Sequence, residues 1–117
     1  MKILIIDDEI HVAAMLAEAV SRQGHQATVA SDGEEGLVLI SQNRPDAVFL
    51  DVVLREMNGI DVLRRIRRTD PTLPVILITG HADPDQLAEA QRLGVTDILE
   101  KPFLLNQLSS ALAFLKA

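Results

Sequence analysis

The feature that most constrains the fold of this chain is a regular alternation of two hydrophobic periodicities. Short runs typical of strands occupy residues 2–6, 26–30, 47–50, 75–78 and 96–99. The runs at 2–6, 47–50 and 75–78 are strongly apolar, as in buried strands, whereas 26–30 is half polar, as expected for an edge strand. After each run, apolar residues recur at the spacing of one helical face. The expected helices span residues 10–23, 31–44, 58–70, 83–94 and 105–115. This order predicts five strand–helix units with no linker and no internal repeat.

Strands separated by helices in this way pair in parallel through right-handed crossovers. The first, third and fourth runs are the most apolar, so we expect them in the middle of the sheet. This ranking favours the flavodoxin-like strand order 2-1-3-4-5. The expected fold class is α/β, a (βα)5 doubly wound, five-stranded parallel sheet. In such sheets a functional site lies at the carboxyl ends of the strands, beside the switch point between the first and third strands.

Local signals support the helix boundaries. Gly24 stands where a glycine is expected after a helix, and Ser31 with Glu34 has the spacing of a capping box. Asn58 and Asp83 are suitable N-cap residues for the third and fourth helices.

The residues that follow the predicted strands carry chemistry. The first strand is followed by Asp7 and Asp8, the third by Asp51, the fourth by Thr79 and the fifth, one residue further on, by Lys101. Carboxylates that converge on neighbouring strand ends need a proton or a cation. Hard oxygen ligands at a water-accessible edge favour Mg²⁺, which also takes phosphate oxygens as ligands. Asp51 could then accept a phosphoryl group whose charge is spread over the metal, Lys101 and Thr79.

Composition excludes several other classes. The length of 117 residues suits one domain, and we expect residues 1–117 to form it. With 11 Lys and Arg against 17 Asp and Glu, the net charge of −6 argues against direct nucleic acid binding by this domain. There is no Cys, no apolar run long enough for a membrane helix and no signal peptide pattern. We therefore expect a cytoplasmic location without membrane attachment.

Taken together, these residues resemble the receiver domain of bacterial response regulators over essentially the whole chain. The resemblance rests on Asp7-Asp8, Asp51, Met57-Asn58-Gly59, Thr79 and Lys101-Pro102-Phe103. Each motif occurs widely by itself, whereas all of them in order at successive strand ends are specific.

The resemblance implies a role for each site residue. Asp51 would be the phosphoacceptor. Mg²⁺ would be bound by Asp7, Asp8, Asp51 and the backbone carbonyl of Val53. Lys101 would contact the phosphoryl group, and Thr79 would turn inward to hydrogen-bond it. The peptide bond between Lys101 and Pro102 would be cis.

The resemblance also implies a function and partners. The chain would be a phosphorylation-dependent signalling switch of a two-component system, phosphorylated by a sensor histidine kinase, and not an enzyme. Phosphorylation would change the partner-binding face formed by the fourth helix, the fifth strand and the fifth helix. Members of this family often form homodimers through that face.

Several positions depart from the family pattern. Ile98 stands where members usually carry Tyr or Phe, a ring that rotates during switching. Arg55 replaces a common proline four residues after the phosphoacceptor. It could pair with a phosphoryl oxygen or with Glu56, and a solvated surface role is favoured. Val53 and His81 occupy positions that help to set the lifetime of the phosphorylated state.

Other interpretations fit the sequence less well. A haloacid-dehalogenase-like phosphohydrolase would carry a second Asp two residues after its nucleophile, where this chain has Val53. A flavodoxin-like carrier of flavin mononucleotide would need aromatic residues, and the chain has no Trp and no Tyr. A docking module that has lost phosphorylation is disfavoured by the intact set of acids. His11 and His25 are expected at the surface, as are the arginines at positions 64, 65, 67 and 68.

Overall fold

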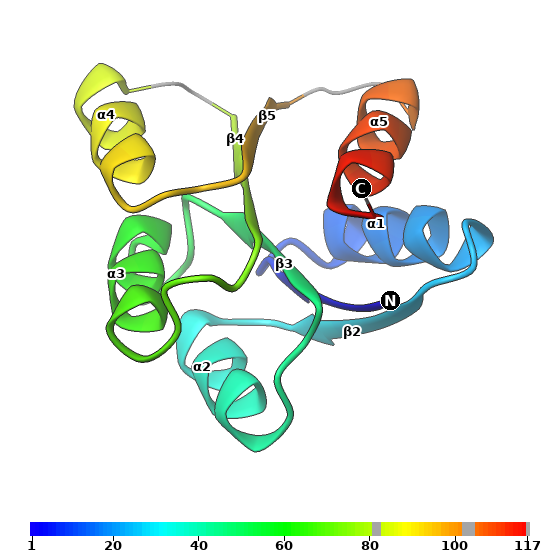
Figure 1. Cartoon of the computed structure of the whole chain (residues 1–117), viewed down its shortest axis with the longest axis horizontal. Helices are drawn as coiled ribbons and strands as arrows, with labels where there is room; N and C mark the ends of the chain where they lie inside the picture. The colour runs from blue at the N-terminus through cyan, green and yellow to red at the C-terminus, as the bar shows by residue number, and fades with distance from the viewer. Residues whose placement is uncertain (81–82, 102–104, 117) are drawn as a thin grey trace.

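The computed structural model describes residues 1–80, 83–101 and 105–116, and strands alternate with helices throughout (Figure 1). The strands are β1 (Lys2–Ile6), β2 (Gln26–Ala30), β3 (Ala47–Asp51), β4 (Val75–Thr79) and β5 (Asp97–Glu100). The helices are α1 (Ile10–Arg22), α2 (Gly33–Gln42), α3 (Gly59–Thr69), α4 (Pro84–Arg92) and α5 (Leu105–Lys116).

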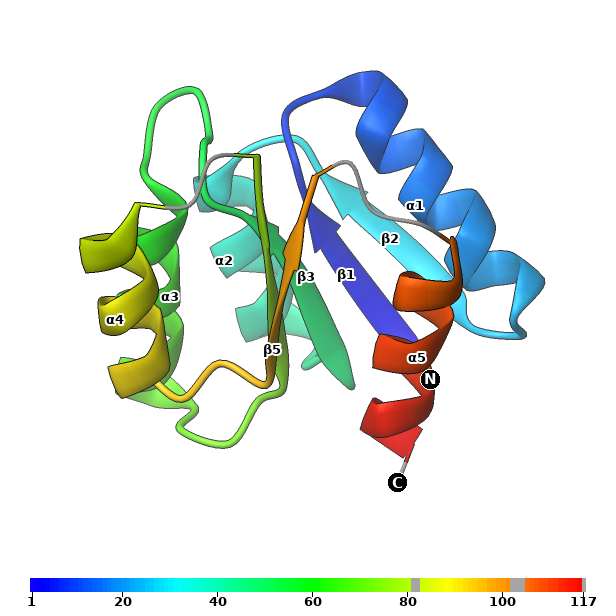
Figure 2. The same ribbon diagram turned by 90° about the horizontal axis from the view of Figure 1, so that it is seen from above.

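The five strands form one parallel sheet in the order β2-β1-β3-β4-β5, which confirms the predicted fold class and strand order. Helices α1 and α5 cover one face of the sheet, and α2, α3 and α4 cover the other (Figures 1 and 2). The register aligns Ile6 with Leu50 and Asp51 with Ile78. As a result, β1 and β3 end side by side at one edge of the sheet, where Asp7 directly follows Ile6.

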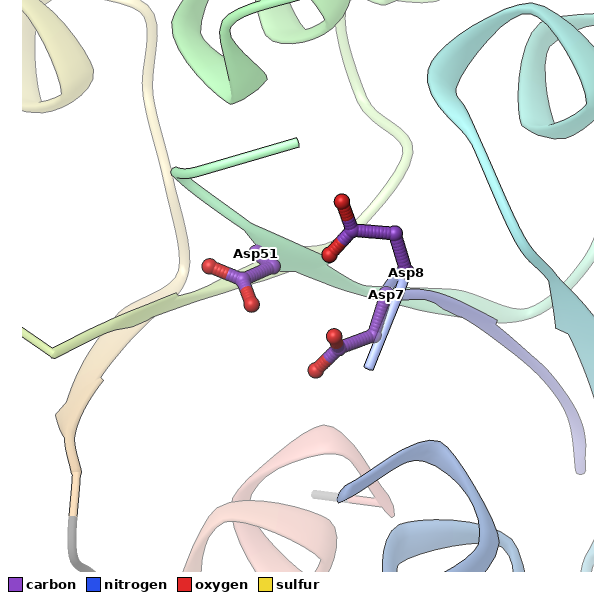
Figure 3. Close-up of side chains that lie close together, drawn as sticks. All are labelled: Asp7, Asp8 and Asp51. Carbon is purple, nitrogen blue, oxygen red and sulfur yellow. The ribbon is translucent and has the colours of Figure 1, made fainter. Parts of the chain in front are cut away.

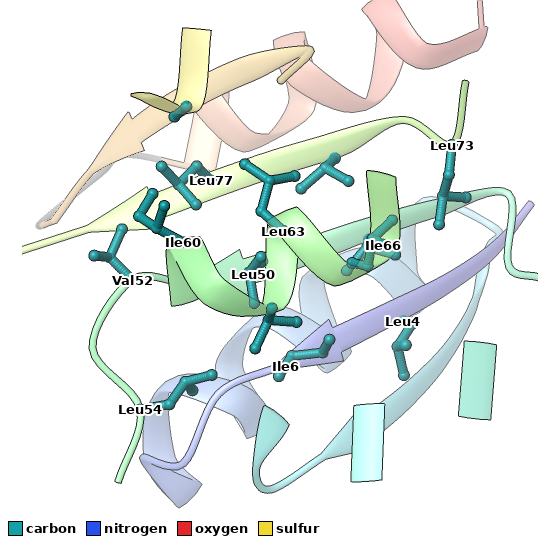
Figure 4. Close-up of a cluster of buried hydrophobic side chains, with 14 of the residues drawn as sticks. Leu4, Ile6, Leu50, Val52, Leu54, Ile60, Leu63, Ile66, Leu73 and Leu77 are labelled. Atoms are coloured by element: carbon teal, nitrogen blue, oxygen red, sulfur yellow. The ribbon is translucent and has the colours of Figure 1, made fainter. Parts of the chain in front are cut away.

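Two hydrophobic clusters hold the helices to the sheet. Successive residues of a strand point to opposite faces, so Ile3 and Ile5 pack under α1 and α5, whereas Leu4 and Ile6 pack under α2 and α3. Figure 4 shows the second of these clusters, in which Leu63 of α3 lies against the central strands. Strands β3 and β4 are buried along their whole length, as expected for the centre of a parallel sheet.

The sequence signals for the helix ends, namely the glycine and the N-cap residues, were accurate to within about one residue. Gly24 has a φ of 87°, the left-handed conformation predicted for a glycine after a helix. The predicted cap of α2 was wrong by one position. The N-cap is Asp32, which accepts a hydrogen bond from the Glu35 amide at 2.8 Å, while the Glu35 carboxylate accepts one from the Ser31 amide at 3.0 Å. Glu34 instead forms an ion pair with Arg65.

Two surface predictions were also wrong. His25 is only 7% exposed, because the pairing of β1 with β2 places it beside the first residue of the chain, and its Nδ1 lies 3.1 Å from the Met1 amino group. Arg67 is half-buried and bonds to backbone carbonyls instead of projecting into solvent.

Candidate functional site

Three aspartates meet at the carboxyl edge of the sheet (Figure 3). Asp7 and Asp8 directly follow β1, and Asp51 is the last residue of β3, the strand that pairs with β1. One carboxylate oxygen from each residue lies within 4.8 Å of the others. The sequence therefore predicted correctly that these three acids come together.

Asp51 is held by two donors on different elements. Its Oδ1 accepts a hydrogen bond from the Val53 amide at 3.0 Å, and its Oδ2 accepts one from Lys101 Nζ at 2.8 Å. The residue is only 3% exposed. Both oxygens are thus fixed at a buried strand end, with a positive charge against one of them.

Lys101 reaches the cluster from the end of β5. Its backbone amide donates to the Thr79 carbonyl at 2.8 Å, and its Nζ lies 3.8 Å from Asp7 Oδ2 in addition to its contact with Asp51. Burial lowers the pKa of the ammonium group. The hydrogen bond to Asp51 and the attraction of both aspartates outweigh burial, so the pKa of Lys101 lies above its usual value. The lysine is therefore positively charged at neutral pH.

Asp7 is the least satisfied member of the cluster. Its Oδ1 accepts a hydrogen bond from the Glu9 amide at 2.9 Å, but its buried Oδ2 has no hydrogen-bond partner among the residues that the structure describes. Burial is the main reason that the pKa of Asp7 rises to about 6, and the negative charge of Asp51 adds to it, while the Glu9 bond acts in the opposite direction. A buried acceptor without a donor, facing two other carboxylates, fits a divalent cation with oxygen ligands.

Asp8 lies nearer to solvent, with its side chain 17% exposed, and Arg55 Nε lies 3.9 Å from its Oδ2. The contact between Asp8 and Arg55 was not foreseen from the sequence. The sequence favoured a solvated Arg55, with a phosphoryl oxygen or Glu56 as its alternative partners, and it did not point to Asp8.

The loop after β3 is tied closely to Asp51. Asn58 is the N-cap of α3, as predicted, because its Oδ1 accepts a hydrogen bond from the Ile60 amide at 2.7 Å. The next residue, Gly59, lies so close to β3 that a Cβ there would overlap the Asp51 carbonyl oxygen and would stand 2.7 Å from the Val52 Cα. This close approach gives a physical reason for the glycine, which the sequence supplied only as part of a motif.

The remaining predicted residues fall at the same edge or outside the described residues. Thr79 ends β4, is buried, and pairs in register with Glu100, the residue before Lys101. Val53 lies two residues after Asp51, in the loop that follows β3, and its side chain is largely exposed. Ile98 is half-buried and packs against the cluster under α3 and α4. His81 and the predicted cis bond at Pro102 lie outside the described residues.

A (βα)5 sheet with an acidic cluster and a lysine at its carboxyl edge defines a receiver-type domain. In agreement, residues 3–113 match the response regulator receiver domain family. The chain therefore belongs to that family and is a receiver domain of two-component signalling, a class that is phosphorylated on an aspartate. Among the described residues, no helix has the length and apolar character needed to cross a membrane.

Named relatives and solved structures agree with this assignment. The chain is 33% identical over 110 residues to sporulation initiation phosphotransferase F of Bacillus subtilis, covering 94% of this chain and 89% of that protein. It is 37% identical over 108 residues to response regulator MprA of Mycobacterium sp. strain KMS, covering 92% of this chain and 47% of that protein. The chain thus spans about half the length of this second relative.

Among solved structures, the receiver domain of NtrX from Brucella abortus superimposes with a TM-score of 0.89 at 33% identity, covering 98% of both chains. A CheY-like receiver domain protein from Methanospirillum hungatei gives a TM-score of 0.92 at 22% identity over 96% of this chain and 90% of that chain, a likeness of fold.

Proposed function

We propose that Asp51 is the phosphoacceptor of a two-component signalling switch and that a sensor histidine kinase phosphorylates it. The observation that carries the proposal is the position of the Asp51 carboxylate. It is buried at a strand end, bonded by Lys101, and placed beside two further carboxylates. An aspartate with a purely structural role would not need a lysine and two further carboxylates gathered around it.

We propose Mg²⁺ as the cofactor of this site, held by Asp7, Asp8, Asp51 and the backbone carbonyl of Val53. The orphaned Oδ2 of Asp7 and the convergence of the three carboxylates support this assignment. When bound, the cation would neutralise the carboxylates and the charge on the transferred phosphoryl oxygens.

In the proposed reaction, a carboxylate oxygen of Asp51 attacks the phosphorus atom of a phosphohistidine. The new O–P bond forms as the P–N bond breaks, and the electron pair of that bond leaves with the imidazole nitrogen. Lys101 already lies 2.8 Å from Asp51 and would stay beside the transferred oxygens as a fixed positive charge. Thr79, on the neighbouring strand end, would donate its hydroxyl hydrogen to one of them.

The proposed output is a shift in a pre-existing equilibrium of the face formed by α4, β5 and α5. Ile98 occupies β5 of this face, and a branched aliphatic side chain has no large ring to move between buried and exposed positions. We therefore assign the coupling to Thr79. We further propose that residues 1–117 form one phosphoacceptor domain that acts in the cytoplasm as a signalling module, not as an enzyme, and that this face forms the homodimer.

Measurement of intact mass tests the proposal. The purified chain is incubated with Mg²⁺ and a small acyl phosphate, and its mass is compared with that of Asp51→Asn treated identically. We expect one added phosphoryl group on the wild type, none on Asp51→Asn, and none on the wild type when a chelator removes the metal. Equal labelling of the variant, or no labelling of the wild type by either the acyl phosphate or a histidine kinase, would refute the assignment.

A further inference from the structure

The loop between β3 and α3 holds Arg55 in a defined position. An antiparallel bridge joins Val53 to Asn58, and the Gly59 amide donates to the Val52 carbonyl at 2.7 Å. Leu54, the neighbour of Arg55, is buried in the hydrophobic cluster under α3. Because the loop is closed at its base and anchored by Leu54, the backbone at Arg55 is fixed at the rim of the carboxylate cluster.

From this position the guanidinium group extends over the acidic edge. The Arg55 side chain is 80% exposed, and its Nε lies 3.9 Å from Asp8 Oδ2. A pocket opens beside it and is lined by Asp8, Ile10, Ser31, Asp32, Arg55 and Glu56. Arg55 and Asp8 therefore both border an open space next to the site.

Within the described part of the chain, two cations contact the carboxylate cluster, and they do so from different elements. Lys101, at the end of β5, is bonded to Asp51 and lies near Asp7. Arg55, in the loop after β3, contacts Asp8 alone. The lysine is committed to the phosphoacceptor, whereas the exposed guanidinium is free to turn toward a ligand that enters from solvent.

We propose that Arg55 is a specificity-determining residue that weakens divalent-cation binding at Asp8 and strengthens binding of an anionic phosphoryl donor. This inference rests on the proposed function. Its physical basis is that one positive charge repels a metal cation and attracts a phosphate at the same edge. The planar guanidinium group also presents two parallel N–H donors to phosphate oxygens, which an ammonium group does not.

The metal part is tested without any phosphorylation. Mg²⁺ is titrated into ¹⁵N-labelled protein, and the amide signals of Glu9 and Val53 are followed, because these amides donate to the carboxylates of Asp7 and Asp51. Removing a charge this close in a solvent-exposed place should tighten Mg²⁺ binding roughly three- to tenfold in Arg55→Ala. Arg55→Lys, which keeps the charge, should stay near the wild type.

Arg22→Ala is the matched control for the metal titration. It removes the same charge from an exposed arginine that pairs with Glu18 on α1, at the other end of the helix from the acidic site. We expect its Mg²⁺ affinity to be unchanged. Unchanged or weaker binding in Arg55→Ala, or an equal gain in Arg22→Ala, would overturn the metal part of the proposal.

The donor part uses the rate of phosphorylation by a small acyl phosphate at saturating Mg²⁺. In Arg55→Ala the donor concentration for half-maximal rate should rise several-fold, and Arg55→Lys should recover only part of this loss. Metal affinity and donor affinity thus change in opposite directions, which simple damage to the loop would not produce. If the wild type accepts no phosphoryl group, the proposed function and the donor part fail together, while the metal titration still decides the metal part. Equal half-maximal concentrations for all variants would refute the donor part alone.

Discussion

At the scale of the residue, Asp7 is a buried acid whose raised pKa couples metal binding to the release of a proton. Its carboxylate is buried beside Asp51, and the pKa rises from 3.8 to about 6 as a result. Without a cation, the site therefore favours a proton on Asp7 below about pH 6. A divalent cation must displace that proton, so we expect Mg²⁺ binding to weaken as the pH falls below about 6.

The raised pKa makes a prediction about stability. Because the folded state holds the proton more tightly than the unfolded chain, the stabilising contribution is complete below about pH 4. It is lost as the pH rises to about 6, where the folded group ionises. In the absence of metal, Asp7→Asn should raise the free energy of unfolding by about 1–3 kcal/mol at pH 7.5 and by much less at pH 4.5.

Urea unfolding followed by circular dichroism, with a chelator present, measures this difference at both pH values. Asp46→Asn is a control, because Asp46 lies at the amino end of β3, away from the cluster. An identical effect of Asp7→Asn at the two pH values would show that ionisation of Asp7 does not govern stability.

Gly59 makes a steric prediction at the same scale. A Cβ at this position would overlap the Asp51 carbonyl, so Gly59→Ala must push α3 away from β3 or move Asp51. Overpacking of this kind costs about 1–3 kcal/mol in the free energy of unfolding. We expect a loss of that size together with weaker Mg²⁺ binding.

Gly80→Ala is the matched control for Gly59→Ala. Among the residues that the structure describes, a Cβ at Gly80 would meet only the Lys101 side chain, at an ordinary contact distance of 3.9 Å. We expect this variant to stay close to the wild type in thermal unfolding and in metal titration. If the two alanine variants behaved alike, the close approach of Gly59 to Asp51 would not be the cause.

At the scale of the element, Arg67 ties the C-terminal ends of α3 and α4 together. Its Nε donates to the Leu93 carbonyl at 2.6 Å, and its Nη2 donates to the Gly94 carbonyl at 3.1 Å. Its Nη1 donates to the carbonyls of Asp70 and Leu73, in the loop before β4, at 3.1 and 2.8 Å. One side chain thus bonds carbonyl groups in the loop before β4 and in the turn that joins α4 to β5, two elements of the proposed output face.

Removing this tie should loosen α4 more than the rest of the chain. Arg67→Ala removes four hydrogen bonds to backbone carbonyls, three of them partly buried, and we expect a loss of about 2 kcal/mol in the free energy of unfolding. Hydrogen exchange should rise first at the amides of α4 and at Val95 and Thr96. Arg68→Ala, at an exposed neighbouring position, is the control and should change neither quantity. Exchange that rises uniformly over the whole sheet would contradict a local role for Arg67.

At the scale of the whole molecule, periodicity was enough to predict the layers and the site edge. Strands joined by helical crossovers are parallel, so their carboxyl ends share one edge of the sheet. Because the strand order also places β1 beside β3, Asp7 and Asp8 converge with Asp51. The features missed depend on side-chain reach and on neighbours distant in sequence. Arg67 is the clearest example, since its partners Leu93 and Gly94 lie just after α4, more than 20 residues further along the chain.

The sequence pattern also gave wrong predictions where a cap moved by one residue, or where burial depended on the pairing of distant segments. The capping signal near Ser31 was correct in kind, but Asp32 offered a competing carboxylate one position later. His25 is a polar residue in a turn, and its burial follows only from the pairing of β1 with β2. Similarly, the contact between Arg55 and Asp8 requires the closed loop after β3.

Our assignment places the phosphoryl group on Asp51 and on neither Asp7 nor Asp8. After phosphorylation in the presence of Mg²⁺, borohydride reduction converts an aspartyl phosphate to homoserine, and peptide mass analysis then locates the altered residue. We expect homoserine at position 51, with Asp7 and Asp8 unchanged. Homoserine at position 7 or 8, with Asp51 intact, would contradict it.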